Sequence, residues 1–223
     1  MLNDTGKLTE WEKCSMLFCG IDEAGRGALA GPVYAAAVIL PDSFDVSLLD
    51  DSKKLSPKRR EIARAAILDG ALYWQIASIP PEQIDKINIL QATLAAMKEA
   101  FETLFARYRY DNANTAAGIE RNLTVIVDGN QLPDIGGNVT LIAEPKADGR
   151  YPCVMAASIL AKTERDYCMI EYHKRYPLYR YDLHKGYGTQ LHRSLIELYG
   201  ASPIQRHSFK FKSVPPHLTA DYR

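Results

Sequence analysis

The sequence predicts an α/β fold in which helices flank a mixed central sheet. Two early apolar runs, at 17–22 and 32–41, have the length of buried strands and are joined by a glycine-rich connection. Further along, segments with helical spacing alternate with apolar runs of strand length. Early strands joined by short turns, followed by alternating helices and strands, are typical of a mixed sheet packed against helices.

The individual elements follow from local signals. Ser56 can cap a helix at 56–70, in which Pro57 takes the first position, and residues 71–80 predict a third strand. Pro80 and Pro81 open a short helix. The remaining predicted elements are a long amphipathic helix at 88–108, a polar loop at 110–122, strands at 123–130 and 138–145, a helix at 151–176 and a final helix within 184–200.

Composition restricts the class of protein. A hydrophobic content of 47% and a charged content of 24% are ordinary for a globular domain, and the apolar runs are too short to cross a bilayer. The start of the chain does not resemble a secretory signal, so we expect a cytoplasmic protein.

The four cysteines and five histidines show no zinc-ligand spacing. The net charge is zero, but basic residues are in excess from Lys146 onward, which suits a positive surface beside an acidic site.

Acidic residues follow the predicted strands. Asp22 and Glu23 end the first strand, Asp128 ends the strand at 123–130, and Asp148 precedes the helix at 151–176. Sites of α/β proteins form at strand ends, and carboxylates gathered there need cations, of which Mg²⁺ or Mn²⁺ prefers oxygen ligands. On a regular strand Asp22 and Glu23 point to opposite faces, so both reach one site only if the strand ends or twists there.

These acids have two other possible interpretations. Each could be a helix cap or turn residue, and Asp128 before Gly129 is a common turn pair. The string at 22–25 is similar to the acidic strand end of ATPases, but the sequence has no GxxxxGK[ST] loop to hold phosphates, which excludes that class.

Three segments are suited to nucleic acid. Gly25, Arg26 and Gly27 offer unshielded backbone amides that can approach a 2′-hydroxyl. The segment 51–61, "DSKKLSPKRRE", carries basic and hydroxyl side chains that can hold phosphates, and Tyr187 lies between two glycines where its ring could stack on a nucleotide. The alternative for each is a solvated helix face or a turn tyrosine folded onto the core.

Taken together, five blocks resemble type 2 ribonuclease H, the ribonuclease HII family. The blocks are "GIDEAGRGALAGPVYAAAVIL", "DSKKLSPKRRE", "VDGN", "PKADGRYPCVMAASILAKTERD" and "HKGYGT", in the family's order between residues 17 and 213. The resemblance implies an RNase H-like fold with a C-terminal helical extension. It also implies an endoribonuclease that cleaves the RNA strand of RNA/DNA hybrids, including 5′ to single ribonucleotides embedded in DNA during ribonucleotide excision repair. Two metal ions, Mg²⁺ or Mn²⁺, would support the hydrolysis, which leaves a 3′-hydroxyl and a 5′-phosphate.

The resemblance also implies roles for particular residues. The metal-binding and catalytic carboxylates are Asp22, Glu23, Asp128 and Asp148, with Asp166 as a lower-ranked rival for the fourth. Gly25, Arg26 and Gly27 would recognise the ribonucleotide to deoxyribonucleotide junction, and Tyr187 would stack on the sugar beyond it. The other implied substrate-binding residues are Ser52, Lys53, Lys54, Lys146 and Lys185.

The implied organisation has four parts: a flexible segment at 1–16, a catalytic domain at 17–180, a helical extension at 181–213 and a flexible tail at 214–223. The chain departs from the family at Ala147, where many bacterial members have glycine, and in a longer loop at 110–122. Two alternatives stay open: another RNase H-like nuclease, such as the third ribonuclease H type, or a non-catalytic module that binds RNA/DNA hybrids. We expect a monomer with no membrane partner.

Overall fold

The computed structural model describes residues 17–50, 52, 54–113 and 123–211. The predicted flexible segments at 1–16 and 214–223 lie outside these residues, as does most of the loop at 110–122. Within the described residues, no helix is both long and apolar enough to span a membrane.

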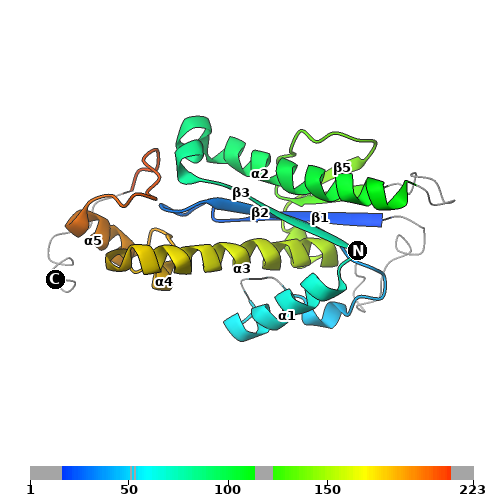
Figure 1. Ribbon diagram of the computed structural model, residues 1–223, viewed down its shortest axis with the longest axis horizontal. Helices are drawn as coiled ribbons and strands as arrows, with labels where there is room; N and C mark the ends of the chain where they lie inside the picture. The colour runs from blue at the N-terminus through cyan, green and yellow to red at the C-terminus, as the bar shows by residue number, and fades with distance from the viewer. Residues whose placement is uncertain (1–16, 51, 53, 114–122, 212–223) are drawn as a thin grey trace.

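A five-stranded mixed sheet forms the centre of the molecule, in the order β3-β2-β1-β4-β5 (Figure 1). The strands are β1 (Leu17–Ala24), β2 (Val33–Ile39), β3 (Tyr73–Ile79), β4 (Leu123–Asp128) and β5 (Thr140–Glu144). The three early strands are antiparallel neighbours, whereas β1, β4 and β5 run parallel. The predicted fold class and all five predicted strands are therefore confirmed.

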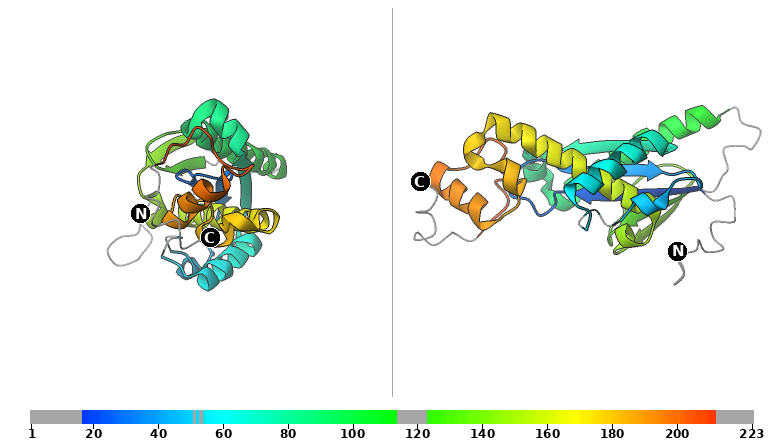
Figure 2. Two further views of the ribbon diagram at one scale, coloured as in Figure 1. Left: turned by 90° about the vertical axis from the view of Figure 1, so that its left-hand side faces the viewer. Right: turned by 90° about the horizontal axis from the view of Figure 1, so that it is seen from below.

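Helices cover both faces of the sheet. α2 (Pro81–Asn112) packs on one face, and α3 (Pro152–Arg175) packs on the other with α1 (Pro57–Gly70) against it. The view along the molecule in Figure 2 places α2 and α1 on opposite sides of the sheet. Each face has its own apolar core, which explains why β1 and β2 are apolar at consecutive positions instead of at alternate ones.

Helix α3 lies unusually close to β1. A Cβ atom added to Gly20 would lie 2.2 Å from the carbonyl carbon of Cys153, so only glycine permits this approach. The small residues Ala156, Ala157, Ser158 and Ala161 are all buried against the sheet, as their spacing predicts. This close contact carries the polar side chains of α3 to the centre of the sheet.

Local signals locate the helix boundaries. The hydroxyl oxygen of Ser56 accepts the N–H of Arg59 at 3.3 Å at the start of α1. α2 breaks at Asn88, which has φ of 67° and whose side chain accepts the N–H of Gln91, so the predicted short and long helices are confirmed as two parts of α2.

The residues after α3 fold back on its end. They form η4 (Pro177–Tyr179), α4 (Tyr181–His184) and α5 (Gln190–Tyr199), of which only α5 has a predicted counterpart. Their small core joins α3 to the loop after β1; it consists of Ala30, Met169, Tyr179, Tyr181 and Ile204. Figure 1 shows this region at the end of the sheet where the β1 to β2 loop lies. The division at 180 and 181 stays a prediction.

Candidate active site

Three of the predicted carboxylates converge. Asp22, Asp128 and Asp148 each offer an oxygen atom, and these atoms lie within 4.8 Å of one another. Ile21 and Val127 are the last paired residues of the parallel strands β1 and β4, and the two aspartates come directly after them. Parallel neighbours in register point to the same face, which brings Asp22 and Asp128 together.

The third carboxylate comes from the segment that leads into α3. Asp148 lies in η3 (Ala147–Gly149) and is 7% exposed. The N–H of Ala147 donates to Oδ1 of Asp128 at 2.8 Å, which ties this turn to the end of β4. The Ala147 methyl group packs with Ile126 and Val154, so the departure from glycine is accommodated.

Asp22 lies in an unfavourable environment for a negative charge. Its side chain is 4% exposed. Burial raises the pKa of its carboxyl well above the usual range, and the charges of Glu23 and Asp128 raise this pKa further. A hydrogen bond from Ser158 and the N–H of Glu23, 2.7 Å from Oδ1, act in the opposite direction. A cation among the carboxylates would relieve this repulsion.

The cluster formed by Asp22, Asp128 and Asp148 fits hard divalent cations. Its ligand atoms are all oxygens, they are partly buried, and the electrostatics of Asp22 favour a positive charge beside it. Oxygen-only sites of this kind are typical of Mg²⁺ and Mn²⁺.

Glu23 lies outside this group of three. β1 stays paired with β2 through Ala24, and regular strand alternation would place Asp22 and Glu23 on opposite faces. After burial, however, the charge of Glu23 is the largest contribution that raises the pKa of Asp22. The Glu23 carboxylate is 3.4 Å from the Arg26 guanidinium. Its role as a ligand stays a prediction.

Ser52 lies behind the carboxylates. It is 2% exposed, and its hydroxyl is 3.0 Å from that of Ser158, which in turn bonds to Asp22. The buried hydroxyl of Ser52 thus supports a carboxylate through Ser158, and its contact with substrate stays a prediction. The signal for Ser158 in the sequence is weak, because it is a single serine among the small residues Ala156, Ala157 and Ala161.

The predicted junction-reading loop leaves β1 directly beyond Asp22 and Glu23. Gly25 is buried with φ of +99°, whereas Arg26 and Gly27 are exposed. A Cβ atom on Gly27 would meet no other atom within 4 Å, so its backbone is open to a partner. The three residues therefore have different structural roles, although the motif presents them as one unit.

Tyr187 lies against this loop. Tyr187 and Ala28 form an isolated antiparallel bridge, and the Tyr187 ring is half-buried with the Arg165 guanidinium 5.0 Å from its centre. Lys185 has φ of 50° and its ammonium donates to the carbonyl of Asp182. The tertiary structure thus brings the motifs at 25–27 and 184–189 together, although they are far apart in the sequence.

The other predicted phosphate contacts are dispersed. Lys146 is exposed, and its backbone adopts the left-handed conformation with φ of 65°, two residues before Asp148. Lys54 is exposed and 3.8 Å from Asp50, and Lys53 lies outside the described residues. Asp166, the rival carboxylate, forms ion pairs with Lys162 and Arg60. That pairing supports ranking it below Asp148 as a metal ligand.

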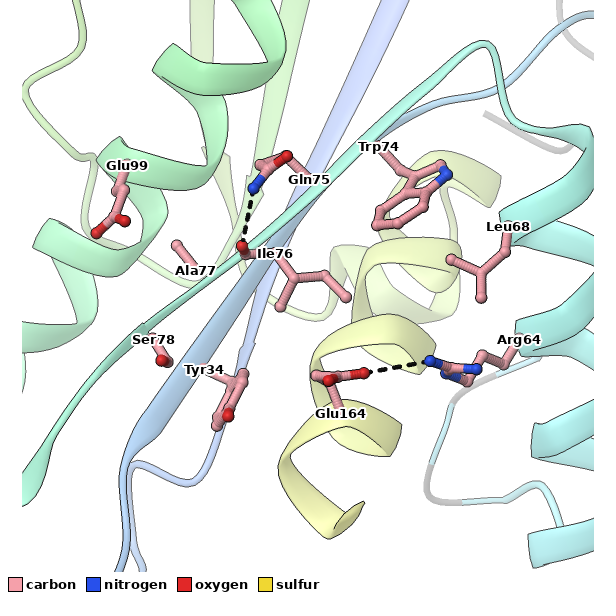
Figure 3. Close-up of a pocket in the computed structure, with 10 residues that line it drawn as sticks. All are labelled: Tyr34, Arg64, Leu68, Trp74, Gln75, Ile76, Ala77, Ser78, Glu99 and Glu164. Atoms are coloured by element: carbon pink, nitrogen blue, oxygen red, sulfur yellow. Dashed lines mark hydrogen bonds and ion pairs between the residues drawn. The ribbon is translucent and has the colours of Figure 1, made fainter. Parts of the chain in front are cut away.

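A separate pocket of about 480 Å³ opens beside the edge strand β3, between α1 and α2 (Figure 3). Trp74, Leu68 and Tyr34 line it, and an ion pair between Arg64 and Glu164 crosses one side. The converging carboxylates are not among its lining residues, so we do not assign it to the candidate active site.

A helix-flanked mixed sheet with carboxylates at the ends of its central parallel strands defines the RNase H-like class of metal-dependent nucleases. Comparison with known sequences narrows the class. The family model of ribonuclease HII matches residues 19–212. The chain is 52% identical to ribonuclease HII of Treponema denticola over 200 residues, which cover 89% of this chain and 100% of that protein. It is 45% identical to ribonuclease HII of Idiomarina loihiensis, over 86% of this chain and 95% of that protein. The chain belongs to the ribonuclease HII family.

Solved structures agree with this assignment. Ribonuclease HII of Archaeoglobus fulgidus, solved in complex with PCNA, aligns with a TM-score of 0.68 and 25% identity over 91% of this chain and 99% of that one. Bst ribonuclease HIII, solved in complex with Mn²⁺, gives a TM-score of 0.68 at 17% identity, over 87% of this chain and 67% of that one, a likeness of fold alone. The protein is a metal-dependent endoribonuclease that acts on RNA/DNA hybrids.

Proposed function

We propose that this protein cleaves the phosphodiester bond on the 5′ side of ribonucleotides, both in continuous RNA/DNA hybrids and at single ribonucleotides embedded in duplex DNA. The products are a 3′-hydroxyl and a 5′-phosphate, and the role is ribonucleotide excision repair by a monomer in the cytoplasm. One observation carries the proposal: the carboxylates of Asp22, Asp128 and Asp148 converge, and the loop that follows Asp22 and Glu23 has open space around Gly27.

The carboxylates are the proposed metal ligands. Asp22, Asp128 and Asp148 hold the ions, and Glu23 is the fourth ligand, whose charge already acts on Asp22. When bound, two Mg²⁺ or Mn²⁺ ions activate water and stabilise the leaving oxygen of the phosphodiester. The role of this chain is to position the duplex so that one particular phosphodiester, the scissile one, lies at the carboxylates.

Substrate recognition falls to the two loops that meet beside the carboxylates. The backbone of Gly25–Gly27 donates to and accepts from the 2′-hydroxyl, which distinguishes RNA from DNA. Tyr187 stacks on the sugar that follows the ribonucleotide. Lys53, Lys146 and Lys185 contact phosphates and set the position of the duplex without reading its sequence.

The test uses three end-labelled duplexes with Mg²⁺ or Mn²⁺: all DNA, DNA with one ribonucleotide, and a continuous hybrid. We expect cleavage 5′ to the single ribonucleotide and within the hybrid, with all-DNA intact. Asp22→Asn, prepared in the same way, controls for contaminating nucleases. Cleavage of the continuous hybrid alone would point to another RNase H-like nuclease, and binding without cleavage in either metal would point to a binding module.

A further inference from the structure

Two arginine side chains with no exposed surface surround the loop after β1. Arg165 of α3 and Arg206 of the C-terminal region are both 0% exposed. They are far apart in sequence, yet both guanidinium groups point at the segment 26–32. A buried guanidinium needs a hydrogen-bond acceptor for each N–H group, so its surroundings indicate what it holds in place.

Arg165 bonds to both of the loops that carry the predicted junction-reading residues. Its Nε and Nη2 donate to the carbonyls of Pro32 at 3.0 Å and Ala30 at 3.2 Å, on the first loop. Its Nη1 donates to the carbonyl of Lys185 at 2.9 Å, on the second. Its guanidinium carbon lies over the Tyr187 ring, 5.0 Å from the ring centre. One rigid planar group therefore spans both loops.

Gly25 makes room for this arrangement. A Cβ atom on Gly25 would lie 2.0 Å from Nε of Arg165. The first glycine of the motif thus packs directly on the arginine, whereas Gly27 faces open space. This contact distinguishes the two glycines and connects the motif to the residue that also holds Tyr187.

Arg206 completes the arrangement from the C-terminal side. Its Nε donates to the carbonyl of Gly31 at 2.8 Å, and its Nη1 donates to the carbonyl of Arg26 at 3.1 Å. Among the described residues, the five side-chain hydrogen bonds of the two arginines all go to backbone carbonyls, and Nη2 of Arg206 has no hydrogen-bond partner. Since a carbonyl carries only a partial charge, two positive charges stay concentrated under the loops, where a polyanion would be attracted.

We propose that Arg165, assisted by Arg206, is a positioning residue that sets the separation between the Gly25–Gly27 loop and Tyr187, and so sets the preference for a single ribonucleotide over a continuous hybrid. This inference rests on the proposed function of both loops. A junction offers one 2′-hydroxyl followed by one deoxyribose, so both loops must match it at once. A continuous hybrid offers a 2′-hydroxyl in every register.

The experiment measures kcat/KM on the single-ribonucleotide duplex and on the continuous hybrid for wild type, Arg165→Lys and Arg206→Lys. Lysine keeps the charge and loses the planar fork. Because a misplacement of about 1 Å can reduce a rate about 10²-fold, we expect the ratio of the two values to fall about tenfold or more. Arg64→Lys is the matched control, because Arg64 also binds α3, through Glu164, but away from both loops. Its ratio should stay within about twofold of wild type, the size of an ordinary surface change of about ±0.5 kcal/mol.

A double-mutant comparison separates positioning from a general loss of structure. In a Tyr187→Leu background, Arg165→Lys should change the ratio by much less than it does in wild type, because the group that it positions is gone. Equal changes in both backgrounds, or an unchanged ratio in folded Arg165→Lys and Arg206→Lys, would overturn the inference. Failure of both lysine variants to fold while Arg64→Lys folds would show a purely structural role and overturn it as well. If wild type does not cleave the single-ribonucleotide duplex, the proposed function itself fails.

Discussion

The hydroxyl groups of Ser52 and Ser158 lie 3.0 Å apart in the interior, and Ser158 bonds onward to Asp22. The two serines connect the segment before α1 to the carboxylate at the end of β1. Groups that hold a metal ligand in this way fix its orientation and tune its charge, and their removal commonly reduces metal affinity 10-fold to 100-fold, roughly.

Ser158→Ala should therefore raise the metal concentration required for half-maximal activity, by about tenfold. The variant removes the hydrogen bond that favours the ionised form of Asp22. The measurement is a titration of activity with Mn²⁺. Ser194→Ala is the control, because the buried Ser194 hydroxyl has no hydrogen-bond partner among the described residues. If Ser158→Ala and wild type require the same Mn²⁺ concentration for half-maximal activity, Ser158 has no role in metal binding.

Asp22→Asn should abolish most activity without loss of stability in the absence of metal. The loss of a ligand worth several kcal/mol corresponds to about 10²-fold or more in rate. Burial raises the pKa of Asp22, so its ionisation in the folded protein lowers stability as the pH rises through that raised value. With EDTA at pH 7.5, the Tm of Asp22→Asn should equal or exceed that of wild type. A lower Tm would contradict this account of its environment.

Gly25→Ala and Gly27→Ala should differ in stability. Gly25 has φ of +99° and would place its new Cβ on Arg165, so we expect a loss of about 2 kcal/mol, a decrease in Tm of several degrees. Gly27→Ala should leave Tm unchanged, because its Cβ would enter open space, and should instead weaken binding of the RNA/DNA hybrid. Thermal unfolding and fluorescence anisotropy with a labelled hybrid in Ca²⁺ measure the two effects. Equal Tm values for both variants would be the contrary result.

Stability should also fall at acidic pH through a stacked histidine pair. The rings of His184 and His192 are 4.2 Å apart, and burial, followed by the charge of His184, lowers the pKa of His192 to about 4. An unfolded histidine has a pKa of about 6.5, so the unfolded chain takes up the proton first as the pH falls. The stabilising contribution is complete above pH 6.5, roughly, and is lost between there and about pH 4.

The variant His192→Phe tests this pH dependence. Phenylalanine keeps an aromatic ring beside His184 and cannot be protonated. Urea unfolding at intervals between pH 7 and 4, roughly, should show a shallower decline for the variant than for wild type. If the free energy of unfolding falls equally with pH in both proteins, the carboxylates and not this histidine pair cause the loss of stability at acidic pH.

Much of the fold could be predicted because its signals are local. The cap at Ser56, the break before the long part of α2 and the strand that ends at Asp128 depend on neighbouring residues and on periodicity. The convergence of Asp22 and Asp128 was also predictable, because carboxyl ends of neighbouring parallel strands meet at one edge of a sheet. The short elements η4 and α4 carry weaker signals and were not predicted.

The sequence by itself therefore determined the sheet, its helical layers, the family and three of the converging carboxylates. Only the tertiary structure decided that Ser158 bonds to Asp22, that Ser52 is buried, and that Arg165 and Arg206 hold the loop after β1. These features could not be predicted because they depend on contacts between residues that are far apart in the sequence. Ser52 meets Ser158 across 106 residues, and Arg206 meets Gly31 across 175. Such contacts depend on how closely whole layers pack, which no local pattern of side chains encodes.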